Sequence, residues 1–158
     1  MPYFLITFTL PCGNGPEALR KIVRANQRVC YQAIFDAGNQ TIRELASGPR
    51  FIGTDRLGFF GALHTWGRDP TVDHPHVHFV VAGGGVSQDG SRWQAAPANF
   101  LLPEKAASMV CRAKFRDAMC EVQWLDEIDS DVWKQKWACD SLPPGSLNKE
   151  FELRLTPT

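Results

Sequence analysis

The sequence of 158 residues predicts an α+β fold in which long amphipathic helices lie across a β-sheet. Short apolar runs that are rich in β-branched and aromatic residues are typical of strands. Two long stretches space their apolar residues by threes and fours, as helices do. Glycine and proline clusters separate these segments. A chain of this length can bury a substantial core, so one domain is expected.

Strands are expected at two places before the centre of the chain. The apolar run 1–10 reads as a first strand that stops at Pro11, and it lacks the basic start and cleavage site of a signal peptide. Residues 57–66 read as a second strand, in which the even-numbered members share one face. A third strand is expected to begin near His74 and to pass into a turn-rich loop over 83–90.

Two helices are expected. One long helix starts near Asn14 and Pro16 and ends near Ser47, because Gly48-Pro49 cannot continue it. The other covers about 104–122. Its cations lie largely outside the apolar stripe, so a solvated face explains them as well as a nucleic-acid contact does; they are Arg112, Lys114 and Arg116.

Three of the four histidines fall within residues 74–78. His76 and His78 project from the same face of a strand, and two adjacent imidazoles on a rigid strand make half of a divalent-metal site. If the second and third strands pair as a hairpin, His64 reaches that face as a third ligand. The alternative is that these histidines are ordinary core or surface residues.

Charge and cysteine content indicate which partners and which redox compartment the sequence fits. Residues 1–120 carry 13 Lys and Arg against 9 Asp and Glu, and residues 121–158 carry 4 against 8. A weakly basic body fits a polyanionic partner, and a solvated surface explains it almost as well. The five cysteines contain no C-x-x-C pair, which favours a reduced cytoplasmic setting and argues against a cysteine zinc site. No apolar run is long enough to cross a membrane.

Several short segments carry a resemblance to a known family. They are residues 6–11, 63–67, 74–78 and 83–93, followed by 100–103 and 114–116. In this order and spacing they resemble the rolling-circle insertion-sequence transposases, within the HUH (His-hydrophobic-His) endonuclease superfamily. The resemblance extends from about residue 3 to 140. It implies a transposase HUH domain over 1–140 and a divergent tail over 141–158.

The resemblance implies an antiparallel β-sheet flanked by helices, as in HUH and Rep-like proteins. In that superfamily two histidines and a third polar group hold Mg²⁺ or Mn²⁺ against the scissile phosphate of single-stranded DNA, and a tyrosine then attacks it. It therefore implies that His76 and His78 are ligands and supports His64 as the third. A three-histidine site also suits Zn²⁺.

Single-stranded DNA is the expected partner. Basic side chains would contact its phosphates, and tryptophans near the cleft would stack on its bases. The expected contacts are Trp66, Arg68, Arg92, Trp93, Arg112, Lys114 and Arg116. For Trp66, a place in the core is the alternative.

The sequence departs from the family at the nucleophile. No tyrosine follows residue 31, and neither Tyr3 nor Tyr31 matches the family's position. The cysteine-rich zinc module that precedes the domain in the family is also missing. We therefore assign no catalytic residue and expect a fragment in which cleavage is absent or depends on another polypeptide, such as a full-length transposase in trans. Two alternatives stay open: a three-histidine hydrolase with Asp69 or Asp73 as its base, and a decayed reading frame without activity.

Overall fold

The computed structural model of the protein describes residues 2–11, 17–66, 73–97, 102–121 and 138–142. Its elements in chain order are β1 Tyr3–Thr9, α1 Glu17–Ala25, α2 Gln27–Ser47, β2 Leu57–Trp66, β3 Asp73–Val86, β4 Trp93–Ala95, α3 Glu104–Glu121 and β5 Ala138–Leu142. The predicted α+β class is confirmed, and the predicted bounds of the second strand and of the last helix agree with β2 and α3 to within a residue.

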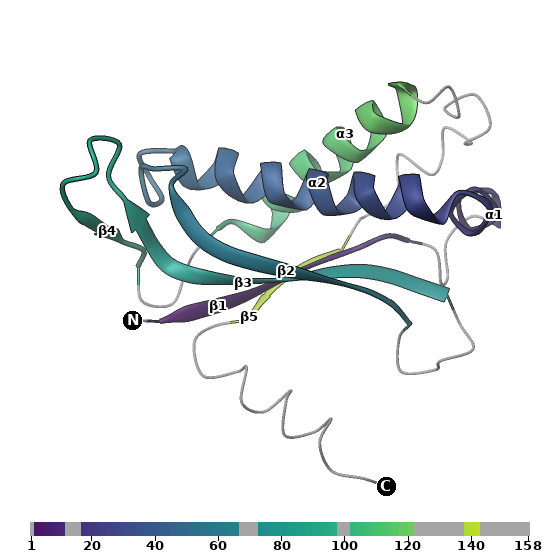
Figure 1. Ribbon diagram of the computed structural model, residues 1–158, viewed down its shortest axis with the longest axis horizontal. Helices are drawn as coiled ribbons and strands as arrows, with labels where there is room; N and C mark the ends of the chain where they lie inside the picture. Colours follow the sequence, from purple (N-terminus) through teal and green to yellow (C-terminus); the bar gives the residue numbers. More distant parts are fainter. Residues whose placement is uncertain (1, 12–16, 67–72, 98–101, 122–137, 143–158) are drawn as a thin grey trace, which may run out of the picture.

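The strands form one antiparallel sheet. Its order is β2-β3-β1-β5, and β4 pairs with the C-terminal end of β3. The helices α2 and α3 lie together on one face of this sheet (Figure 1). Since β3 pairs with β2 on one side and with β1 on the other, side chains from all three strands meet along it.

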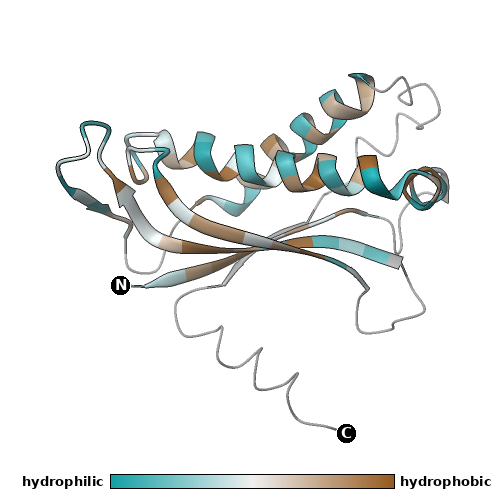
Figure 2. Ribbon diagram, in the orientation of Figure 1, coloured by the Kyte–Doolittle hydropathy of each residue, from teal (hydrophilic) through white to brown (hydrophobic). Residues whose placement is uncertain are grey.

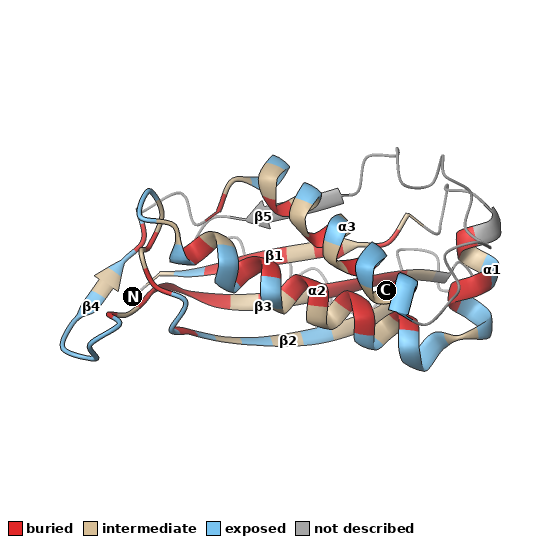
Figure 3. Cartoon of the chain, turned by 90° about the horizontal axis from the view of Figure 1, so that it is seen from above, coloured by how far each residue is buried: buried red, intermediate tan, exposed pale blue. Residues whose placement is uncertain are grey.

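The core lies between the helices and the sheet. Alternate residues of β1 and β3 point into it, and the apolar stripes of the helices face them (Figure 2). Phe8 and Phe79 meet edge to face there, with ring centroids 6.1 Å apart. Helix α2 approaches closely at Gly38, where a Cβ atom would come within 2.6 Å of the Phe79 ring. Buried residues accordingly line the contact between the two layers (Figure 3).

The predicted single long helix is wrong, because it is divided at Asn26. This residue has a non-helical ψ of 42°, and its side-chain amide donates a hydrogen bond to the carbonyl of Ile22 at 3.1 Å. Asparagine competes for backbone partners in this way and is therefore favoured at helix ends. The chain consequently turns between α1 and α2.

The loop predicted over 83–90 is also wrong in its first half. Strand β3 continues through the three glycines to Val86, because Gly84 and Gly85 pair with β4 and Gly85 also pairs with Leu57. The remaining turn is tight, since the amide of Ser87 donates to the carbonyl of Arg92. The glycine run therefore extends the sheet, and the turn begins after it.

The strand β5 was not predicted. It pairs antiparallel with β1, with Thr9 opposite Ala138 and Leu5 opposite Leu142. The residue numbers of β5 straddle the expected boundary at residue 140. Of the expected tail over 141–158, residues 143–158 lie outside the described residues.

Candidate metal centre

Three histidines meet on the face of the sheet away from α2 and α3. His64 was expected to join His76 and His78 only if the second and third strands pair as a hairpin. They do, since β2 pairs with β3 and places His64 opposite His76. The ring centroids of His78 lie 4.7 Å from those of both His64 and His76. We call this side of the sheet the histidine face and these three residues the histidine cluster.

Hydrogen bonds orient two of the rings. The Nδ1 of His76 lies 2.7 Å from the carbonyl oxygen of His74, which can only accept, so this nitrogen carries a proton, and in the neutral imidazole Nε2 keeps the lone pair. The Nδ1 of His78 lies 2.8 Å from the hydroxyl of Thr7 on β1. Partners of this kind fix the tautomer and direction of metal-binding imidazoles. Thr7 is not among the site residues predicted from the sequence.

The donor set can hold a metal ion. One nitrogen from each of the three rings lies within 4.8 Å of the others, and His76 is 7% exposed. A tetrahedral ion that touches all three at about 2.1 Å would hold the donor nitrogens about 3.4 Å apart, so the rings would have to rotate toward one another to bind it. Imidazole nitrogen binds transition metals well, and the cluster therefore fits a divalent ion of that kind.

Trp66 borders the cluster. Its ring stacks on that of His64, with centroids 5.3 Å apart and an angle of 9° between the planes. The pairing of β2 with β3 shifts register between these two residues, and bulges of this type often lie beside functional sites. Trp66 is 52% exposed, so the alternative of a core position is excluded.

The other expected DNA contacts are spread over the molecule. Arg92 is exposed in the loop before β4, and Trp93 begins β4. The cations of α3 belong to the helical layer, where Lys114 pairs with Glu44 of α2 at 2.7 Å. The structure thus does not bring Arg112, Lys114 and Arg116 together with the histidine cluster, and Arg68 and Asp69 lie outside the described residues.

The loop that carries Arg92 is held by Asp89. Hydrogen bonds from Ser87 and Ser91 hold the pKa of this carboxyl far below its ordinary range. At the base of the same loop, a hydrogen bond from Gln88 lowers the pKa of Asp55. Both carboxylates are therefore charged at neutral pH and act as fixed acceptors for the loop.

The two tyrosines of the sequence lie apart from the cluster. Tyr31 belongs to α2 and packs against the core on the helical side. Tyr3 starts β1 on the histidine face, but it is four residues before Thr7, or about 13 Å at a rise of about 3.3 Å per residue. Neither phenol is beside the three imidazoles.

The fold is an α+β domain with an antiparallel sheet, consistent with the HUH or Rep-like fold, and it has a candidate metal centre on its sheet. Comparison with known proteins agrees with this class. Residues 58–158 match the model of the family described as "Putative transposase", and the chain belongs to this family of insertion-sequence transposases.

Two curated relatives show the same relationship. The chain is 42% identical over 113 residues to "Putative transposase y4qJ" of Sinorhizobium fredii, a match that covers 72% of this chain and 27% of the relative. It is 32% identical over 82 residues to the "Transposase for insertion sequence element IS801" of Pseudomonas savastanoi pv. phaseolicola, covering 44% and 20%. The chain thus spans about a quarter of the length of the first relative and a fifth of the second. No solved structure matches it.

None of the described helices combines the length and apolar character that a lipid bilayer requires of a spanning segment.

Proposed function

We propose that this chain is the metal- and single-strand-binding part of a rolling-circle transposase of the HUH type. The observation that carries the proposal is the histidine cluster, because three imidazoles converge on one sheet face in a chain of a transposase family. His64, His76 and His78 would hold a divalent ion. Such an ion supplies a Lewis acid that withdraws charge from the oxygens of a scissile phosphate.

The donor set bears on the choice between the two expected ions. Mg²⁺ prefers oxygen ligands and keeps much of its water, whereas Mn²⁺ accepts imidazole more readily. Three nitrogen donors therefore favour Mn²⁺ over Mg²⁺, with Zn²⁺ as the competitor. Hydrogen bonds to the His74 carbonyl and to Thr7 orient the rings of His76 and His78, and binding of an ion through Nε2 of His78 would require its Nδ1 to donate to the Thr7 hydroxyl.

We assign the DNA to the histidine face. Trp66 stands exposed beside His64 and offers a ring for base stacking, while Arg92 and Trp93 lie further along the sheet. The cations of α3 lie on the other layer, so we assign them a separate role in phosphate attraction. Arg112, Lys114 and Arg116 would then add affinity that is independent of the cluster.

The nucleophile for strand transfer comes, in this proposal, from outside residues 1–158. Tyr3 and Tyr31 both lie away from the imidazoles that would hold the ion. A tyrosine-bearing transposase polypeptide acting in trans is the partner that would supply it. A cytoplasmic location belongs to the same proposal, because the DNA partner resides there in bacteria such as those that carry the relatives.

The metal assignment can be tested by calorimetric titration with Mn²⁺. We expect His64→Ala, His76→Ala and His78→Ala each to weaken binding by more than the 10- to 100-fold that loss of a supporting partner costs. His74→Ala is the matched control, because it removes an imidazole from the same strand but outside the cluster. Equal binding by all four variants would contradict the assignment.

The DNA assignment can be tested with a labelled single-stranded oligonucleotide that carries the terminal sequence of the insertion element. We expect tighter binding to the single strand than to duplex, with affinity that falls steeply as salt rises. Incubation with Mn²⁺ should give no covalent protein–DNA band until a tyrosine-bearing relative is added. Metal-dependent cleavage by the chain alone, with free ends and no protein link, would favour the three-histidine hydrolase instead.

A further inference from the structure

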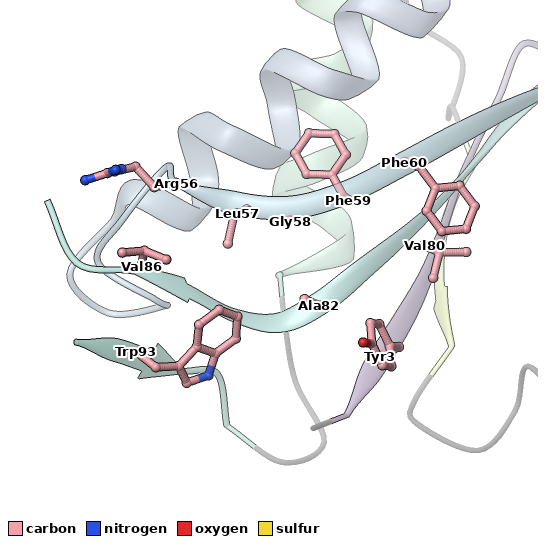
Figure 4. A pocket seen from close by; sticks show the side chains of 10 residues that line it. All are labelled: Tyr3, Arg56, Leu57, Gly58, Phe59, Phe60, Val80, Ala82, Val86 and Trp93. Carbon is pink, nitrogen blue, oxygen red and sulfur yellow. The ribbon is translucent and has the colours of Figure 1, made fainter. Parts of the chain in front are cut away.

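A hollow lined by aromatic rings lies on the histidine face, beyond the cluster. Tyr3 of β1 and Phe60 of β2 form its walls, Val80 and Ala82 of β3 form its floor, and Trp93 of β4 lies at its end (Figure 4). Its volume is about 780 Å³. We call these five residues the aromatic groove.

The groove follows from the pairing of the strands. Tyr3 is paired with Ala82 and Phe60 with Val80, so the large rings flank the small side chains of the central strand. Phe60 is 68% exposed, Tyr3 46% and Trp93 45%. Three large rings exposed together on one face are a feature of binding surfaces, because burial in the core would otherwise be favourable.

The ring of Trp93 is supported by backbone. Gly84, with a φ of +155°, packs directly beneath it, and a Cβ atom there would come within 2.7 Å of two indole carbons. The glycine therefore makes room for the indole, and β4 holds that ring against β3. A ring that is already in place loses little conformational entropy when a ligand stacks on it.

The charge of the groove suits a polyanion. Among the described residues that line it, Arg56 is charged and no carboxylate is present. Its guanidinium donates to the carbonyls of Ser87 and Gln88 at 3.3 and 3.1 Å, which keeps it at the edge of the groove. Arg92 is exposed next to Trp93. The carboxylates of Asp55 and Asp89 interact electrostatically with Arg56 and Arg92, respectively, but neither carboxylate lines the groove. Aromatic rings beside fixed positive charge are what single-stranded nucleic acid requires.

The groove lies on the same face of the sheet as the histidine cluster. Phe60 and His64 share a face of β2 and lie four positions apart in regular pairing, about 13 Å at about 3.3 Å per residue. A stacked strand rises about 3.4 Å per nucleotide, so this distance corresponds to about four nucleotides. A strand with a phosphate at the cluster would therefore reach the groove.

We propose that the aromatic groove binds nucleobases of single-stranded DNA by stacking, about four nucleotides to one side of the phosphate at the histidine cluster. This rests on the proposed function for its ligand. It adds a second stacking site, made by Tyr3, Phe60 and Trp93, on the opposite side of the cluster from Trp66. Because every base has an aromatic face, the groove tolerates different sequences.

The test is fluorescence anisotropy of a labelled 30-nucleotide single strand of mixed sequence, in EDTA and in Mn²⁺. We expect Phe60→Ala to lower the affinity about 5- to 150-fold in both conditions, the range found for loss of one stacked base. Met109→Ala is the matched control, because it removes a side chain of similar exposure from α3. An oligonucleotide with abasic residues keeps the phosphates and removes the bases, so Phe60→Ala should then have no effect.

The outcomes separate the two proposals. Equal affinity of wild type and Phe60→Ala overturns the groove, as does the same loss with the abasic strand. If His76→Ala binds Mn²⁺ like wild type, the proposed metal centre is overturned. The affinity of Phe60→Ala for the single strand in EDTA does not depend on the metal and still tests the proposed groove. A further outcome is that the wild type sediments as a dimer that Phe60→Ala dissociates without a change in DNA affinity. That result would assign the groove to a second copy of the chain and overturn the proposal.

Discussion

The hydroxyl of Thr7 offers a sharp test of how the metal centre is organised. It lies 2.8 Å from Nδ1 of His78 and belongs to β1, which pairs with β3 at that point. For Nε2 of His78 to bind an ion, Nδ1 must carry the proton and donate it to the Thr7 oxygen. Thr7→Val keeps the shape of the side chain and removes that acceptor.

The expected effect is moderate. Loss of a supporting hydrogen bond typically weakens metal binding 10- to 100-fold. The same bond also exists without the ion, so only its strengthening on binding contributes to the difference. We therefore expect the lower end, about tenfold for Thr7→Val, which corresponds to about 1.4 kcal/mol. Thr7→Ser restores the hydroxyl and should bind within about twofold of wild type.

Calorimetric titration with Mn²⁺ at fixed pH measures this difference. Thr9→Val is the matched control, because it makes the same change two residues along β1, opposite His76 in the pairing. Thermal unfolding of each variant without metal checks that the fold persists. The reasoning is refuted if Thr7→Val binds like wild type, or if Thr7→Ser binds as weakly as Thr7→Val.

Gly38→Ala should lower the free energy of unfolding in urea by about 1–2 kcal/mol, because the added Cβ would meet the Phe79 ring at 2.6 Å. The higher helix propensity of alanine offsets only part of this overpacking. An unchanged denaturation midpoint would contradict the close approach. At pH 8, a thiol reagent followed by peptide mapping should modify the exposed Cys120 much faster than Cys30, because burial raises the pKa of the Cys30 thiol to about 11. The thiol of Cys30 ionises at a higher pH in the folded chain than in the unfolded chain, so its contribution to stability is present below pH 9 and is lost as the pH rises toward 11. The fall in stability over that interval should therefore be smaller in Cys30→Ala.

Local patterns were sufficient for much of the fold. The apolar alternation of β2 and the helical spacing of α3 predicted both elements, because each depends on near neighbours in the chain. The pair His76 and His78 could be assigned to one face by the same rule. His64 needed one further condition, the antiparallel pairing of two successive strands, and that pairing is present.

Features that depend on distant residues were missed. Thr7 is 71 residues from His78, and no local pattern connects them, although a threonine amid apolar residues of a strand was a signal. The aromatic groove needs Tyr3 from the first strand beside Phe60 from the second. The strand β5 has little strand propensity of its own and depends on its pairing with β1.

The position of His64 has a consequence for motion. Among the described strands β2 ends the sheet, so its backbone pairs with β3 alone, whereas His76 and His78 belong to a strand that is paired on both sides. Edge strands open locally at lower free energy than central ones, and their amides exchange hydrogen sooner. An ion bound by all three imidazoles would join the edge to the centre. Amide exchange in β2 should therefore slow on addition of Mn²⁺ more than in β1, and the opening of β2 would set how fast the ion enters and leaves.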